Sequence, residues 1–196
     1  YFAHPVFKFK VENYSNHNKI LLEYINYLNK RDPEGQKKSN IGGWHSPFFD
    51  LNDNENEGYK FLKILQPYII DVFKSCGWAY DPKKVFLSGM SQGCCMALDA
   101  GLTFPQEIGG IIGFKGHLIK RTLKDLSTKQ KVWVCHGFND KTIFYDFATE
   151  TYNRLKEKNK DIYLLTQNCN HSMVSGIINQ MKSIKDHFPI DPMNRL

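Results

Sequence analysis

Short apolar runs alternate with amphipathic helical patterns along the second part of the chain. Four of the runs predict buried strands, at residues 84–88, 109–114, 131–136 and 161–166. Apolar residues at helical spacing predict helices at 92–104, 143–158 and 173–188, with a helical turn at 123–126. Strands that alternate with helices in this way predict the α/β class, with a mostly parallel sheet and helices on both faces.

The first 84 residues follow a different pattern. Residues 1–11 alternate apolar and charged side chains, as a strand does, and residues 18–30 place apolar side chains at helical spacing. Residues 33–56 are polar and turn-rich, which predicts a long surface loop. Residues 59–76 predict a second helix that Pro67 should kink or restart. We interpret residues 1–196 as a single domain with an atypical part at 1–84 and the core at 85–196.

The composition is that of a globular protein, with 196 residues of which 41% are hydrophobic. No apolar run approaches the length of a membrane span and no signal peptide is visible at the start, so we expect no stable membrane insertion. The chain opens at Tyr1 without a methionine, which leaves room for an upstream piece. The net charge of +6 comes mostly from scattered lysines, which indicates a solvated surface and no nucleic-acid partner. The pattern does not indicate an oligomeric state.

The cysteines and histidines indicate neither a disulfide framework nor a metal site. The five cysteines are odd in number and show no C-x-x-C spacing. Cys94, Cys95 and Cys135 lie in apolar segments and fit small buried hydrophobic residues. We therefore expect a reducing, cytoplasmic compartment. Five histidines show no paired spacing with Asp, Glu or Cys that would suggest a metal site, so no metal is expected; they are His4, His17, His45, His117 and His187.

A strand, a sharp turn and a helix meet around Ser91. Residues 85–87 form a short apolar run with a β-branched and an aromatic residue, and the pattern Gly-x-Ser-x-Gly follows from Gly89 to Gly93 before a helix-forming run. The glycines let the strand and helix backbones approach closely while the serine hydroxyl projects above the sheet. This context predicts a nucleophile elbow with Ser91 as the nucleophile.

Two further loops carry the partners that such a serine needs. A serine hydroxyl requires a base, and the base requires a group that holds its tautomer and its charge. Asp140 follows the strand at 131–136, and His171 follows the strand at 161–166, both at the carboxyl ends where the sites of such sheets lie. The order Ser, Asp, His is that of the α/β-hydrolases. The alternatives are Asp140 as a helix N-cap, His171 as a loop residue bonded to backbone, and His136 as a structural residue beside the Gly137 turn.

The developing oxyanion needs preorganised N–H donors. The residue after the nucleophile supplies one of them, which predicts the backbone N–H of Gln92. The second should come from a loop after an earlier strand. The candidate is the segment from Tyr1 to Val6, where Pro5 has no N–H and Val6 therefore becomes the expected donor.

The run from Phe86 to Leu98 resembles the elbow of the acyl-protein thioesterase/carboxylesterase/phospholipase family, whose turn reads G-[FM]-S-Q-G. Residues 105–114, 132–140 and 170–171 are similar to further segments of that family, so the resemblance spans about residues 85–188. It implies an α/β-hydrolase fold, no cofactor, and cleavage of carboxylic esters or thioesters, often with long, lipid-like acyl chains. By position, it assigns Ser91, Asp140 and His171 as a catalytic triad.

The first 84 residues resemble the opening part of 2-oxoglutarate/iron oxygenases at residues 32–46, and residues 77–85 extend that resemblance. The His-x-Asp signature of the iron site is absent from the chain, so oxygenase activity is not carried over. Two alternatives remain for this part: an unrelated segment joined to a hydrolase core, or the hydrolase family's own Trp-Phe-Asp loop at residues 43–51. The alternative to an esterase is a non-catalytic α/β scaffold that keeps the triad without a working oxyanion hole.

Overall fold

A computed structural model describes residues 14–31, 33–34, 71, 80–118, 130–158, 161–172 and 176–189. The chain divides into two compact units, Tyr1–Tyr80 and Asp81–Leu196. The strand predicted at 1–11 and the turn predicted at 123–126 lie outside the described residues, as do nearly all of the loop at 33–56 and the helix at 59–76. The interpretation of residues 1–196 as one domain stays a prediction.

The first unit contains helix α1, Tyr14–Arg31, which is longer at both ends than the predicted helix at 18–30. Its last turn carries Lys30 and Arg31, whose positive charges suit the negative end of the helix dipole. None of the described helices, α1 included, is both long and apolar enough to cross a membrane.

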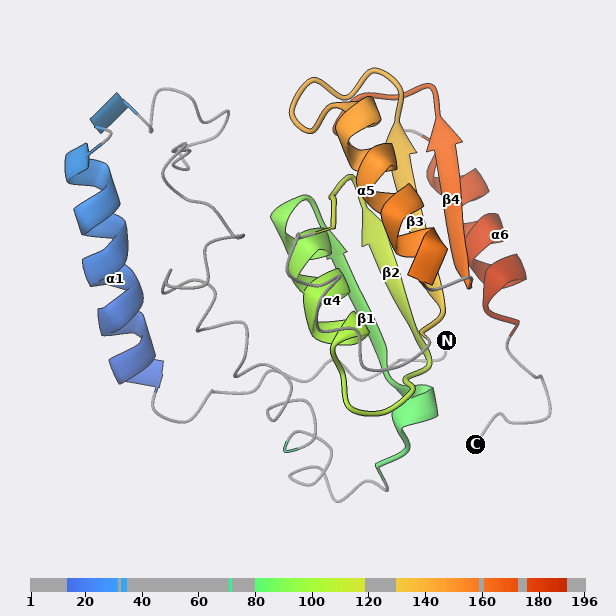
Figure 1. The fold of residues 1–196 in the computed structure, drawn as a ribbon, viewed down its shortest axis with the longest axis horizontal. Helices are drawn as coiled ribbons and strands as arrows, with labels where there is room; N and C mark the ends of the chain where they lie inside the picture. The colour runs from blue at the N-terminus through green and yellow to red at the C-terminus, as the bar shows by residue number, and fades with distance from the viewer. Residues whose placement is uncertain are drawn as a thin grey trace, which may run out of the picture. The chain divides into compact units, whose positions relative to one another are not determined.

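The second unit is built on a parallel four-stranded sheet in the order β1-β2-β3-β4. The strands are β1 Phe86–Met90, β2 Gly110–Phe114, β3 Val132–Gly137 and β4 Ile162–Gln167. The helices are α4 Gln92–Leu102, α5 Tyr145–Lys158 and α6 Ile177–His187. Figure 1 shows α4 and α5 in front of this sheet and α6 behind it. The predicted α/β class, with a parallel sheet covered on both faces, is confirmed.

The two faces of the sheet pack differently. On the α4 face, a Cβ at Gly113 would lie 2.5 Å from the Cys94 sulfur, and one at Gly101 of α4 would lie 2.4 Å from Ile111 Cδ1. The small residues thus let α4 lie directly on β2. On the α6 face, Trp133 is fully buried in one cluster with Cys135 and Phe188, and its indole N–H donates to Ser183 Oγ at 2.9 Å. Side chains alternate between the faces because successive strand residues point to opposite sides.

Three elements of the second unit begin two or more residues later than the sequence predicts. Strand β1 begins at Phe86 rather than 84, because Pro82–Lys84 form a short 3₁₀ turn, η2, whose N-cap Asp81 accepts the Lys83 N–H. Helix α5 begins at Tyr145 rather than 143, because the Asp140 carboxylate takes the N–H groups of Thr142 and Ile143. Helix α6 begins at Ile177, after Gly176 with a positive φ of 79°.

Candidate active site

Ser91 is the single residue between β1 and α4. Its backbone lies in a left-handed conformation, with φ 55° and ψ −123°. Its N–H donates to the Phe114 carbonyl at 2.8 Å, and its own carbonyl accepts the Cys94 N–H at 3.0 Å. Such a conformation costs a non-glycine residue about 1–3 kcal/mol, and it persists because the strand ladder on one side and the helix on the other hold it. The turn lifts the Ser91 side chain off the sheet.

The close approach of strand and helix depends on Gly89. A Cβ at this position would lie 2.1 Å from the carbonyl oxygen of Gly93, which is a backbone atom that cannot move aside without shifting α4. A Cβ at Gly93 would meet no atom within 4 Å. Of the two glycines in the predicted elbow, the first one is therefore required by packing, whereas the second one contributes its backbone to the contact.

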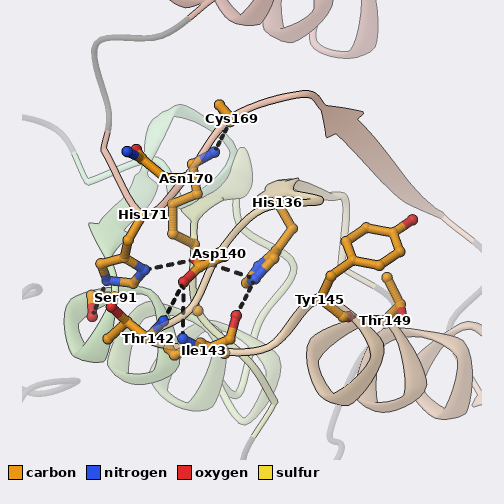
Figure 2. Close-up of polar contacts among 12 residues, drawn as sticks. Ser91, His136, Asp140, Thr142, Ile143, Tyr145, Thr149, Cys169, Asn170 and His171 are labelled. Carbon is orange, nitrogen blue, oxygen red and sulfur yellow. Dashed lines mark hydrogen bonds and ion pairs between the residues drawn. The ribbon is translucent and has the colours of Figure 1, made fainter.

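The structure brings Ser91, His171 and Asp140 into one hydrogen-bonded chain, as Figure 2 shows. His171 Nε2 lies 3.0 Å from Ser91 Oγ, and His171 Nδ1 lies 2.7 Å from Asp140 Oδ2. The three residues come from the carboxyl ends of β1, β3 and β4. The His171 side chain keeps 24% of its surface exposed, while that of Asp140 is fully buried. The histidine end of the chain is thus partly accessible to solvent, whereas the carboxylate end is buried.

Asp140 is held as a carboxylate by the groups around it. Oδ2 faces His171, and Oδ1 accepts the backbone N–H groups of Thr142 and Ile143, each at 2.9 Å. Burial by itself would raise the pKa of Asp140, but the hydrogen bonds from His171 and from these two N–H groups hold the pKa below its usual range. Asp140 is not the N-cap of α5, which begins only at Tyr145; its Oδ1 instead caps the turn before that helix, while Oδ2 pairs with His171.

His136 also contacts this carboxylate, which the sequence pattern did not indicate. The His136 ring is fully buried. Its Nε2 lies 2.9 Å from the Ile143 carbonyl oxygen and 3.4 Å from Asp140 Oδ2. Burial lowers the pKa of His136, so the ring is neutral near pH 7 with its proton on Nε2. Nδ1 is buried without a hydrogen-bond partner in the described part of the chain. The four-residue spacing between His136 and Asp140 was the feature of the sequence that could have indicated this contact.

The position of the first expected oxyanion donor, Gln92, is described by the structure, and its role stays a prediction. Gln92 is the first residue of this helix, where backbone N–H groups have no partner within the helix. Val6, the second expected donor, lies outside the described residues, and its role stays a prediction. Within the described ranges, no group of three or more His, Cys, Asp or Glu could hold a metal ion.

Comparisons with known proteins agree with this architecture. The model of the phospholipase/carboxylesterase family matches residues 14–190. Acyl-protein thioesterase 1 of Yarrowia lipolytica is 28% identical over 114 residues, which are 50% of this chain and 49% of the relative. Acyl-protein thioesterase 1 of Gibberella zeae is 25% identical over 173 residues, which are 72% and 73% of the two chains. The chain spans about half the length, or less, of the first curated relatives that it matches.

Solved structures show the same fold. The crystal structure of esterase PE8 superposes with a TM-score of 0.62 at 19% identity, covering 87% of this chain and 86% of that one. The crystal structure of Arabidopsis thaliana SOBER1 gives a TM-score of 0.59 at 19% identity, covering 69% and 64%. The fold is that of the α/β-hydrolases, and the resemblance seen at the elbow is confirmed. The resemblance of residues 1–84 to oxygenases stays a prediction.

Proposed function

Since the chain belongs to the phospholipase/carboxylesterase family, we propose that it is a serine hydrolase that cleaves carboxylic esters or thioesters. The observation that carries this proposal is the unbroken hydrogen-bonded chain from Ser91 Oγ through His171 to Asp140. A hydroxyl within 3.0 Å of an imidazole, whose other nitrogen lies 2.7 Å from a buried carboxylate, has the arrangement of an activated nucleophile.

The geometry supports a two-step acyl transfer. His171 Nε2 takes the proton of Ser91 as Oγ attacks the acyl carbonyl, and the same nitrogen then returns the proton to the leaving alcohol or thiol. Asp140 keeps the Nδ1 proton on the inner side of the ring and stabilises the imidazolium that forms. The Gln92 N–H stabilises the oxyanion, and one such donor contributes about 3 kcal/mol in mutational tests. Water then releases the acyl group from Ser91 by the same steps.

The acyl group is proposed from the relatives. The relatives from Yarrowia lipolytica and Gibberella zeae are named acyl-protein thioesterases, and the solved neighbours include a carboxylesterase. We therefore propose an acyl thioester or ester as substrate, with no resident cofactor. The non-catalytic alternative is not favoured, because these relatives are named for hydrolysis. A cytoplasmic location and a second donor from Val6 remain part of this proposal.

A covalent probe tests the proposal directly. The full chain is treated with a fluorophosphonate, and the adduct is mapped by mass spectrometry beside the variant Ser91→Ala. Ser88→Ala serves as the matched control, because Ser88 lies three residues earlier on β1 and outside the hydrogen-bonded chain. We expect an adduct on Ser91 in the unchanged chain and in Ser88→Ala, and none in Ser91→Ala, together with turnover of acyl thioesters or p-nitrophenyl esters of graded length. A folded protein without an adduct, under conditions that label a control esterase, would contradict it.

A further inference from the structure

The side-chain amine of Lys115 is buried against a cysteine. Lys115 follows the last residue of β2 and is fully buried, and its Nζ lies 2.6 Å from the sulfur of Cys169. This contact is the only hydrogen bond of the amine among the described residues. Buried lysines are ordinarily paired with carboxylates, because an isolated ammonium group is costly to bury. Here a thiol occupies the partner's position.

The backbone holds both members of the pair in place. The Lys115 N–H donates to the Cys135 carbonyl at 2.8 Å, with φ 54° at Lys115. The Cys169 carbonyl accepts the Asn139 N–H at 3.1 Å, and a Cβ at Gly137 would lie 2.1 Å from that carbonyl oxygen. The amine and the sulfur therefore meet on a packed scaffold rather than on two exposed side chains, and a reaction between them needs little movement.

The separation of the two atoms is short for a hydrogen bond. An N–H···O bond has a donor–acceptor distance of about 2.9 Å, and sulfur is a larger acceptor than oxygen. A single oxygen atom bonded to both nitrogen and sulfur spans a separation of this size, whereas a direct sulfur–nitrogen bond would need the two atoms to move much closer together. We propose that Lys115 and Cys169 form an oxidative modification site, at which an oxygen atom from a peroxide bridges Nζ and Sγ.

The reaction balances with hydrogen peroxide as the oxidant. The first peroxide oxidises the Cys169 thiol to a sulfenic acid and leaves one water. The second oxidises the sulfenic acid together with the NH₂ form of the Lys115 side chain, so that the sulfenic oxygen bonds to Nζ and two waters leave. The thiol loses its hydrogen, the amine loses one of its two hydrogens, and one oxygen enters. Two equivalents of a dithiol reductant supply four electrons and four protons. They restore the thiol and the amine, and the bridging oxygen leaves as water.

The other described cysteines lack this arrangement. Burial raises the pKa of the Cys95 and Cys135 thiols to about 11, in the second case despite the nearby Lys115 amine, which lowers it. Burial raises the pKa of Cys94 even further. These thiols stay protonated near pH 7, and the protonated form is a poor nucleophile toward peroxide. Cys169 is the described cysteine that contacts an amine, and the residue keeps 6% of its surface exposed.

The bridge would act on the loop that carries His171. Residues 168–172, named here the His171 loop, follow β4, and Figure 2 shows Cys169, Asn170 and His171 one after another along it. A covalent link from Cys169 to the end of β2 would tie this loop to the centre of the sheet. We expect the oxidised protein to unfold at a higher temperature than the reduced one, because the link restricts the unfolded chain between residues 115 and 169.

The test is intact-mass and peptide analysis of the full chain after treatment with hydrogen peroxide. We expect a gain of about 14 Da, from one oxygen gained and two hydrogens lost, on a linked pair of peptides that contain Lys115 and Cys169, reversed by dithiothreitol. The gain should persist in Cys135→Ala and be absent from Cys169→Ala and Lys115→Met. Peptide mapping of the unchanged chain decides the matter even if one variant fails to fold.

Three results would overturn the proposal. The first is a gain of about 16 or 32 Da on Cys169 alone, which is simple oxidation of the sulfur. The second is a loss of about 2 Da that disappears in Cys135→Ala, which is a disulfide. The third is a folded protein whose Lys115 and Cys169 peptides remain unlinked and unmodified. None of these readouts depends on hydrolysis, so failure here is distinct from failure of the proposed esterase activity.

Discussion

Two neighbouring strands of the sheet are each followed by a residue with nearly the same positive φ, and the two side chains have different surroundings. Strand β1 is followed by Ser91 with φ 55°, and β2 by Lys115 with φ 54°. These are the only residues other than glycine with positive φ in the described part of the chain. Each donates its N–H, at 2.8 Å, to a carbonyl on the next strand, Ser91 to Phe114 and Lys115 to Cys135.

The side chains of the two turns meet the same loop at different depths. Ser91 Oγ meets His171, whose side chain is partly exposed, whereas the Lys115 amine is fully buried against Cys169 two residues earlier. A residue with positive φ at a strand end therefore holds its side chain in a fixed direction. The surrounding residues decide whether that side chain faces a substrate or the protein interior. Because the partners are separate residues, changes on one side should leave the other side intact.

The largest expected effect is a loss of catalysis through the Ser91–His171–Asp140 chain, without a change in the Lys115–Cys169 pair. Asp140→Asn keeps the shape of the side chain but removes the charge that orients His171, and kcat for ester hydrolysis should fall by about 10⁴-fold. Asp146→Asn, in the first turn of α5, is the matched control and should change kcat little. Steady-state kinetics on a p-nitrophenyl ester measures both. If Asp140→Asn retained more than about a tenth of the activity, the network described here would not be the catalytic one.

The next effect is a difference in stability between variants of Gly89 and Gly93, the two glycines of the elbow. Gly89→Ala places a Cβ against the Gly93 carbonyl and should lower the free energy of unfolding by about 3 kcal/mol or more, since a backbone atom cannot be repacked. Gly93→Ala meets nothing within 4 Å and should leave stability unchanged or raise it by up to about 1 kcal/mol through helix propensity. Urea unfolding measures the difference, and equal losses in the two variants would be evidence against the packing described here.

A smaller effect tests whether the two turns are equivalent. Glycine tolerates positive φ and alanine does not, so Ser91→Gly should be more stable than Ser91→Ala by about 1 kcal/mol. The pair Lys115→Gly and Lys115→Ala should show a difference of the same sign. Urea unfolding of the four variants gives both differences, with the side-chain loss nearly cancelled within each pair. A pair in which alanine is the more stable variant would show that its turn is not strained.

The smallest expected effect is on how the free energy of unfolding depends on pH. The pKa of His136 in the folded protein is lower than its ordinary value of 6.5, so the unfolded chain binds the proton first as the pH falls. Stability should therefore decrease as the pH falls below about 6.5, until the folded-state pKa is reached. His187, whose pKa is also lowered by burial, contributes in the same direction.

Unfolding free energies between about pH 7.5 and about pH 5 should show a shallower slope for His136→Gln than for the unchanged chain. The lowered pKa of Asp140 adds a separate loss below about pH 3.8, because its contribution is present above that value and disappears as the folded-state carboxylate is protonated. An unchanged slope in His136→Gln would mean that the ring titrates alike in the folded and unfolded states.

Sequence alone predicted the strands and helices of the second unit and the three residues that the hydrogen-bonded chain joins. Gly-x-Ser-x-Gly, the polar loop at Asp140 and the loop at His171 each lie directly after an apolar run, and parallel strands bring their carboxyl ends to one edge. Local pattern and strand direction were sufficient here, because both are encoded within a few residues. The boundaries at 84–86 and 143–145 were missed, because side chains of Asp81 and Asp140 take backbone N–H groups that a continuing strand or helix would otherwise use.

The tertiary structure alone decided which groups share a carboxylate and which lysine is buried. His136 approaches Asp140 because the chain turns back after β3, and Lys115 reaches Cys169 across 54 positions of sequence. In the sequence, Lys115 is one of many lysines, and burial of a cation runs against the ordinary preference of that residue. Contacts of this kind depend on how three strands and their loops pack together. No local pattern encodes the Lys115–Cys169 contact, because its two residues are far apart along the chain and are brought together only by the packing of the sheet.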